Sequence, residues 1–181
     1  MDPIAAVIGQ PAPDFVLQDL DGRPFRLGEQ RGRILVLSFW SADCPHSERA
    51  DEILTALSVE WGDSVGAWWV ASNDNEDEER LRRTSLQRHV GPVLRDPGQA
   101  AADRYTAQVT PHLFVIDERG LLRYAGAPDD VSFRQRVPTR NYLADAVQAL
   151  LHGQAPDPAS TAPYGCAIVR GHVGPRPTTR L

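Results

Sequence analysis

The sequence predicts a single α/β domain built around a mixed β-sheet. Strand-like and helix-like segments alternate through the first half of the chain, and two adjacent strand-like segments followed by a helix close the domain. The length of 181 residues and the 41% share of apolar residues suit one domain with a buried core. We place the domain at residues 1–153 and a tail at 154–181, where Gly, Pro, Ser and Thr become frequent.

Hydrophobic periodicity marks the elements of the first half. Asp21-Gly22 is a favoured turn dipeptide and predicts a hairpin. Nearly continuous apolar runs predict buried strands, and apolar residues spaced at i, i+4 and i+8 predict a helix. The predicted elements are a β-hairpin at 14–27, a strand at 33–40, a helix at 45–61, a strand at 65–72 and a helix at 76–90.

The second half predicts smaller elements and ends in a tail. The expected elements are a short strand at 93–95, a brief helix at 97–105, strands at 112–117 and 121–125, and a helix at 139–151. In the tail only residues 167–169 look able to pair as a strand, so the tail either wraps over the domain or is partly mobile. This element order is that of the thioredoxin fold with an N-terminal β-hairpin extension and a C-terminal tail.

Charge and hydropathy narrow the classes of partner. The net charge of −5 argues against nucleic acid, because phosphate binding requires a basic surface. No run reaches the roughly 18 consecutive apolar residues of a membrane span, so we expect no membrane partner. The chain starts without a basic segment followed by an apolar run, which predicts a cytoplasmic protein without a signal peptide.

Cys44 is the predicted reactive residue. It lies between a predicted buried strand and a helix that begins at Pro45, and proline favours the first helical turn. Cys44 is therefore the expected N-cap, where unpaired backbone N–H groups and the helix dipole stabilise the nucleophilic thiolate. The alternative is an inert thiol, because cysteine is commonly a buried core residue. His46, in the first helical turn, either favours this thiolate or is an ordinary exposed residue.

A second signal lies at Thr110-Pro111, directly before a predicted strand. A proline entering a strand removes a donor from the ladder and is usually placed there for a turn or a cis bond. The alternative is a trans proline at the start of the strand.

Several segments resemble one known family. Residues 39–47, FWSADCPHS, resemble the F-W-x-x-x-C-P-x-C active site of thioredoxin-like redoxins, which group alkyl hydroperoxide reductase and thiol-specific antioxidant proteins with thioredoxin-like reductases. Residues 9–15 resemble the G-x-x-A-P-x-F segment of this family. Thr110-Pro111 resembles its cis-proline loop, and residues 165–168 resemble a late G-C-x-I segment of one subgroup. The resemblance spans about residues 8 to 170.

The resemblance implies a thiol-dependent oxidoreductase, antioxidant and peroxiredoxin-like in kind. Cys44 would attack a peroxide or a protein or small-molecule disulfide, and an external thiol reductant such as a thioredoxin would restore it. The Thr110 backbone would pair with an extended substrate. We expect no cofactor and no metal. The residues expected to line the substrate groove are Trp40, Pro45, His46, Ser47, Thr110 and Pro111.

Two departures from the family pattern leave the substrate open. Ser47 stands where a thioredoxin has its second cysteine, so a C-x-x-C dithiol cycle is excluded. Typical peroxiredoxins carry P-x-x-x-T-x-x-C, and here Leu37 and Ser41 occupy the proline and threonine positions. The sequence therefore does not choose between peroxide reduction and disulfide exchange.

Cys166 is the second of the two cysteines in the chain. A sulfenic acid or mixed disulfide at Cys44 needs another thiol to resolve it, and Gly165 permits a close backbone approach. We hypothesise that Cys166 attacks Cys44 to form an intramolecular disulfide. The alternatives are an intermolecular partner, an inert tail thiol, and a structural disulfide that ties the tail down.

A different class of function also fits these residues. Cys44, Cys166, His46 and His112 carry the thiolates and imidazoles that suit copper(I) or zinc. The alternative hypothesis is therefore a non-catalytic binding domain or copper carrier that keeps the fold without turnover.

Overall fold

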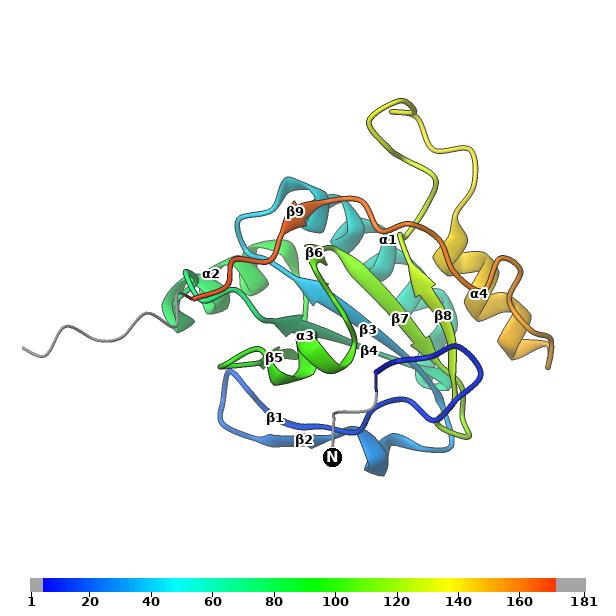
Figure 1. Ribbon diagram of the computed structural model, residues 1–181, viewed down its shortest axis with the longest axis horizontal. Coiled ribbons are helices and arrows are strands. Elements are labelled where there is room, and N and C mark those ends of the chain that lie inside the picture. Colours follow the sequence, from blue (N-terminus) through cyan, green and yellow to red (C-terminus); the bar gives the residue numbers. More distant parts are fainter. Residues whose placement is uncertain (1–4, 172–181) are drawn as a thin grey trace, which may run out of the picture.

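A seven-stranded mixed sheet organises the computed structural model, which describes residues 5–171 (Figure 1). Its strands, in chain order, are β1 (Val16–Asp19), β2 (Pro24–Arg26), β3 (Ile34–Trp40), β4 (Val65–Ala71), β5 (Val93–Arg95), β7 (His112–Ile116) and β8 (Leu122–Gly126). They lie in the order β2-β1-β5-β4-β3-β7-β8. The pairs β3–β4 and β4–β5 are parallel and the other pairs are antiparallel, which confirms the predicted mixed sheet.

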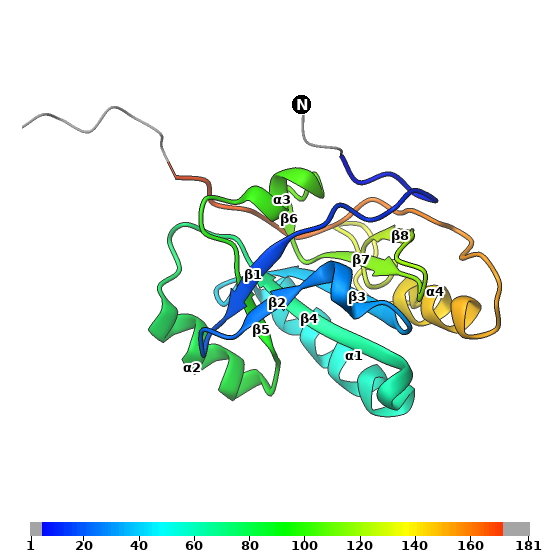
Figure 2. The ribbon, with the colours of Figure 1, turned by 90° about the horizontal axis from the view of Figure 1, so that it is seen from below.

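Helices cover both faces of this sheet. They are α1 (Pro45–Trp61), α2 (Glu78–Arg88), α3 (Ala100–Arg104) and α4 (Tyr142–Leu151), with single 3₁₀ turns at Leu27–Gln30 and Gly62–Ser64. In Figure 2, α1, α2 and α4 lie on one side of the sheet and α3 on the other. No helix within the described residues is long and apolar enough to span a bilayer.

Strand β3 is buried along its whole length because it lies between two hydrophobic cores. Val36 faces the core under α1 and α4, where it joins Leu54 and Leu143. Leu37 faces the opposite core, which contains Phe15 from the N-terminal segment. A strand with apolar neighbours on both sides has a continuous apolar sequence, which is the pattern that predicted it.

Three helices begin later than the sequence predicted: α3 starts at Ala100 and not at 97, and α2 and α4 are delayed by side-chain caps. Helix α2 starts at Glu78 because the Asp77 side chain accepts a hydrogen bond from the Arg80 N–H at 2.8 Å and caps the helix. Helix α4 starts at Tyr142, capped by Asn141, because the Thr139 N–H is held instead by the Asp130 carboxylate at 2.9 Å. Side-chain caps therefore set the starts of α2 and α4.

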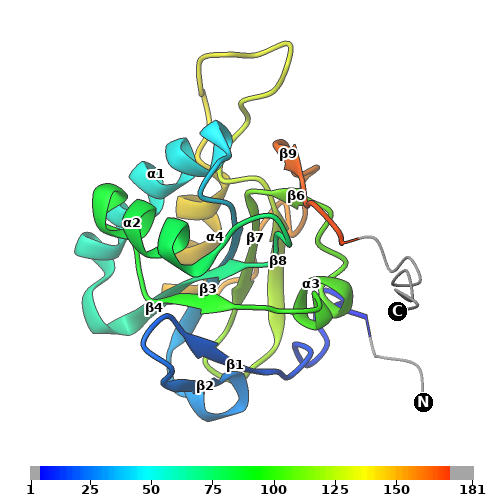
Figure 3. The ribbon, with the colours of Figure 1, turned by 90° about the vertical axis from the view of Figure 1, so that its left-hand side faces the viewer.

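Residues 154–171, the described part of the tail, wrap over the domain, which is one of the two outcomes that the sequence allowed. Strand β9 (Cys166–Ala167) pairs antiparallel with β6 (Val109–Thr110) to form a separate two-stranded sheet. In Figures 1 and 3 the tail crosses the molecule with β9 beside β6. This crossing brings residues from the end of the chain to the first turn of α1.

Candidate redox site

Cys44 is the N-cap of α1, as predicted from the sequence. Its backbone is extended, with φ −88° and ψ 119°, and Pro45 occupies the first helical turn. The Cys44 carbonyl accepts the Glu48 N–H at 3.1 Å, which is the first helical hydrogen bond. Only 1% of the residue is exposed.

The Cys166 sulfur lies 2.6 Å from the Cys44 sulfur, although the residues are 122 positions apart. The β6–β9 pair places them together, because Cys166 is opposite Thr110 in the register. The Cys44 sulfur also lies 3.0 Å from the Thr110 carbonyl oxygen. Both cysteines are free thiols, and their separation needs little change to reach the roughly 2.05 Å of a disulfide bond.

Gly165 allows this approach. A Cβ atom at position 165 would lie 2.0 Å from the Thr110 carbonyl oxygen, so the backbone of the tail presses directly against β6. Any side chain at this position would push β9 and the Cys166 sulfur away from Cys44.

Hydrogen bonds stabilise the thiolate form of Cys44. Burial raises the pKa of the Cys44 thiol, but hydrogen bonds from the Cys166 thiol and from the backbone at Ser47 outweigh burial, so the net pKa is lowered. Burial and the same contact with Cys44 raise the pKa of Cys166 to about 12. In the reduced site Cys44 therefore ionises before Cys166, and its thiolate accepts a hydrogen bond from the Cys166 thiol.

The Thr110 hydroxyl contributes to this environment. The Thr110 side chain lowers the pKa of Cys44, and its buried Oγ1 atom has no hydrogen-bond partner among residues 5–171. Thr110→Val keeps the shape but removes the hydroxyl, so we expect the pKa of Cys44 to rise. Thiolate absorbance at 240 nm, measured against pH in Cys166→Ser with and without Thr110→Val, tests this. An unchanged titration would contradict the role of the hydroxyl.

The two acidic residues next to Cys44 are paired with arginines. Asp43 lies 2.8 Å from Arg80, and Glu48 lies 3.7 Å from Arg88. Their charges are therefore partly balanced, which limits their opposition to a thiolate.

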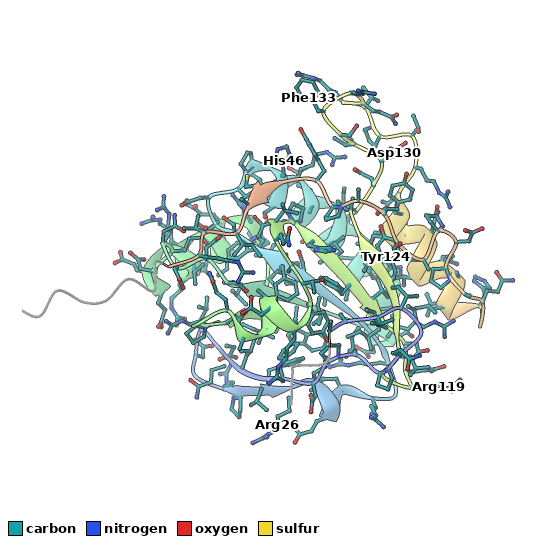
Figure 4. All side chains as sticks on the ribbon, in the orientation of Figure 1. Arg26, His46, Arg119, Tyr124, Asp130 and Phe133 are labelled. Carbon is teal, nitrogen blue, oxygen red and sulfur yellow. The ribbon has the colours of Figure 1, made fainter. Side chains whose placement is uncertain are left out.

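The structure brings some of the predicted groove residues to the two sulfurs. The Thr110–Pro111 peptide bond is cis, as expected from the sequence. The His46 ring, whose position is labelled in Figure 4, packs edge-on against the Tyr164 ring of the tail, with centroids 4.8 Å apart. Pro45 is exposed beside them.

Trp40 and Ser47, by contrast, do not line an open groove. Both side chains are 0% exposed. The Trp40 indole points into the core and donates to Asp51 at 2.9 Å, and the Ser47 hydroxyl accepts the Ser41 N–H at 3.3 Å. This corrects the expectation that they contact a substrate: they support the Cys44 loop from behind.

The family model for AhpC/TSA matches residues 8–125, which is more than half of the chain. The chain belongs to the AhpC/TSA family. This agrees with the resemblance found in the sequence.

Individual relatives of this AhpC/TSA protein include the thiol-disulfide oxidoreductase ResA of Halalkalibacterium halodurans. It is 32% identical over 113 residues, which cover 62% of this chain and 64% of the relative, less than two thirds of its length. Solved structures of a hypothetical protein, SMc02350, from Sinorhizobium meliloti (29% identical) and of an uncharacterized conserved protein from Geobacillus kaustophilus (26%) each have a TM-score of 0.83. They cover 93% of this chain and 97% and 94% of their own chains, so the likeness extends past residue 125. These neighbours confirm the thioredoxin-like fold.

Asp51 is a site-supporting residue of this AhpC/TSA protein that sequence reasoning missed. The carboxylate is 2% exposed and accepts the indole N–H groups of Trp40 at 2.9 Å and Trp69 at 2.7 Å. Arg88 lies 3.3 Å from it and donates at 2.9 Å to the carbonyl of Ala42, two residues before Cys44. Burial raises the pKa of Asp51 to about 6. The network thus links the core to the Cys44 loop.

His112 follows the cis proline of this AhpC/TSA site and is buried. Its Nδ1 atom has no hydrogen-bond partner among the described residues, and burial lowers its pKa to about 4 from 6.5. Because the unfolded chain then takes up a proton before the folded chain does, acidification through this range favours unfolding.

We expect the stability contributed by neutral His112 to fall by about 2 kcal/mol between pH 7 and pH 5. Urea unfolding of the wild type and of His112→Phe at both pH values isolates this effect. The free energy of unfolding should fall more between pH 7 and pH 5 in the wild type than in His112→Phe. A difference that does not change with pH would rule out the buried neutral imidazole.

The site offers no arrangement that favours the copper hypothesis. Within residues 5–171, no group of three or more His, Cys, Asp or Glu side chains is placed to hold a metal ion. Cys44 and Cys166 supply two sulfurs in contact, whereas His46 is engaged with Tyr164 and His112 packs against Phe114 at 4.3 Å.

Proposed function

We propose that this protein is a thiol-disulfide oxidoreductase whose redox couple is Cys44 and Cys166. The observation that carries the proposal is the 2.6 Å contact between the two sulfurs at the start of α1. Membership of the AhpC/TSA family and the similarity to a protein named thiol-disulfide oxidoreductase ResA support it.

The couple replaces the C-x-x-C pair of thioredoxins. Ser47 takes the place of the second cysteine, and β9 supplies the missing sulfur from the tail. Oxidation joins Cys44 and Cys166 in a disulfide. An external disulfide accepts the two electrons and two protons and leaves as two thiols. An external thiol reductant, such as a thioredoxin, reverses the reaction.

Peroxide reduction, the other substrate class that the sequence left open, has less support. The residue at the threonine position, Ser41, donates its hydroxyl hydrogen bond to Glu76 at 2.5 Å. Leu37, at the proline position, is fully buried in the core. We therefore propose disulfide exchange as the activity, and the antioxidant role that the resemblance implied stays a prediction.

Other expectations from the sequence also stay predictions. They are the cytoplasmic location, the lack of a nucleic-acid or membrane partner, the lack of a cofactor, and the domain boundary at residue 153. The alternative function is a non-catalytic copper carrier, and equilibrium dialysis against copper(I) measures copper binding directly.

The experiment that tests the proposal compares two oxidants. Reduced protein is mixed with one equivalent of glutathione disulfide or of hydrogen peroxide, and acid-quenched samples are analysed by intact mass and peptide mapping. We expect glutathione disulfide to give a product two hydrogens lighter that contains a Cys44–Cys166 disulfide, faster than peroxide does. Faster oxidation by peroxide would favour a peroxidase, and two unreacted thiols in both samples would contradict the proposal.

A further inference from the structure

The segment that carries Cys166 lies where an extended substrate would pair. In sheet-edge recognition, a peptide adds a strand through main-chain hydrogen bonds. At this site the edge of β6 is already paired with β9, with Thr110 opposite Cys166. We call residues 162–167 the strap. The strap is part of the same chain, so it competes with any peptide for this edge.

The strap is fastened at its N-terminal end. The Thr161 N–H donates to the Ala125 carbonyl at 3.0 Å, and the Thr161 hydroxyl accepts the Ala127 N–H at 3.0 Å. Gly126 lies directly beneath, and a Cβ atom there would lie 2.2 Å from the Thr161 hydroxyl oxygen. The close contact shows that this end of the strap is packed tightly on β8.

The C-terminal end is fastened as well. The Ile168 side chain is buried, and its N–H donates to the Gln108 carbonyl at 2.8 Å. The Val169 N–H donates to the Asn73 side chain at 2.6 Å, and the Val169 carbonyl accepts from the Gln99 side chain at 2.8 Å. Releasing the strap therefore breaks hydrogen bonds at both ends.

The two sulfurs under the strap differ in access. Cys44 is 1% exposed, whereas Cys166 is half-buried. With the strap in place, an outside molecule reaches the Cys166 sulfur first. In the disulfide form, attack on Cys166 expels Cys44, whose thiolate leaves at the N-terminus of α1, where the helix dipole and the backbone N–H at Ser47 stabilise it.

From this geometry we propose that the protein exchanges with compact, low-molecular-weight thiols and disulfides at the Cys166 sulfur, and that the strap excludes extended polypeptides. The proposal rests on the proposed function and narrows its substrate class. It also differs from the order expected from the sequence, in which Cys44 attacks the substrate first.

The exchange takes two steps. A small thiolate attacks the Cys166 sulfur of the Cys44–Cys166 disulfide, forms a mixed disulfide on Cys166 and releases Cys44 as a thiolate. A second small thiolate attacks the small-molecule sulfur of the mixed disulfide and releases Cys166. Two small thiols become one disulfide, and the protein gains two electrons and two protons. The reverse sequence reduces a small disulfide.

The test uses oxidised full-length protein and two reduced probes. One is glutathione, and the other is an unstructured peptide with a central cysteine flanked by several residues on each side. Samples are quenched with acid, blocked with N-ethylmaleimide and mapped. We expect the mapped product to carry glutathione on Cys166 and the blocking group on Cys44. We expect the peptide to react at least about tenfold more slowly than glutathione.

Two variants sharpen this test. In Gly165→Ala the added methyl group displaces the strap from Thr110, so we expect the preference for glutathione over the peptide to shrink. Ala155→Ser, which adds one atom at an exposed position outside the strap, should keep the wild-type preference.

Mapping the wild type decides the outcome even if Gly165→Ala fails to fold. Glutathione found on Cys44, or equal rates with glutathione and the peptide, would overturn this proposal and leave the proposed function standing. A protein that forms no Cys44–Cys166 disulfide on oxidation would overturn both.

Discussion

Cys44→Ser is expected to reduce thiol–disulfide exchange to the background rate. The serine hydroxyl is not ionised at neutral pH and cannot form the disulfide, so the couple with Cys166 is lost. Turnover of glutathione disulfide, coupled to an external dithiol reductant, measures the loss.

The same variant should also accumulate a stable adduct. Cys166 remains half-exposed in Cys44→Ser, and a mixed disulfide formed there has no neighbouring thiol to resolve it. Cys166→Ser is the matched control for adduct formation. It also loses turnover, but its remaining thiol, Cys44, stays buried under the strap. Unfolding midpoints close to that of the wild type exclude misfolding. Wild-type turnover in Cys44→Ser would contradict the assignment of the couple.

Asp51→Ala is expected to lower the free energy of unfolding by about 3–5 kcal/mol at a pH above 6, where the carboxylate is ionised. The substitution leaves the Arg88 charge largely buried without its partner, and it leaves the indole N–H groups of Trp40 and Trp69 without an acceptor. Urea denaturation at pH 7.5 measures the loss.

Asp51→Asn provides the control for this prediction. The amide oxygen can still accept one indole hydrogen bond, so the loss of stability should be smaller than in Asp51→Ala. An Asp51→Ala loss below about 1 kcal/mol would mean that the network contributes little to stability.

Local sequence patterns predicted most of the fold and the position of Cys44 at the start of α1. Pro45 after an apolar run places a helix start at Cys44, since both the proline preference and the dipole act within one turn. Thr110-Pro111 predicted the cis bond for a similar local reason. Helix starts at Glu78 and Tyr142 were misplaced because side-chain caps, and not apolar spacing, decide them.

The rest of the site depends on contacts between distant segments. Nothing in the spacing of Cys44 and Cys166 fixes their distance, because the path of the tail depends on anchors such as Thr161 and Ile168. Gly165 was the one local feature that indicated a close backbone approach near Cys166, since it allows the contact with Thr110. Asp51 was missed because its partners Trp40, Trp69 and Arg88 come from three separate elements.

The redox couple itself is tested most directly by equilibrating the protein in buffers of graded glutathione redox potential. Samples are acid-quenched, the free thiols are blocked, and the products are mapped by mass spectrometry. We predict a single two-electron transition in which Cys44 and Cys166 of the same chain pass together from two thiols to one disulfide. Separate transitions of the two cysteines, or disulfides only between chains or with glutathione, would contradict the account.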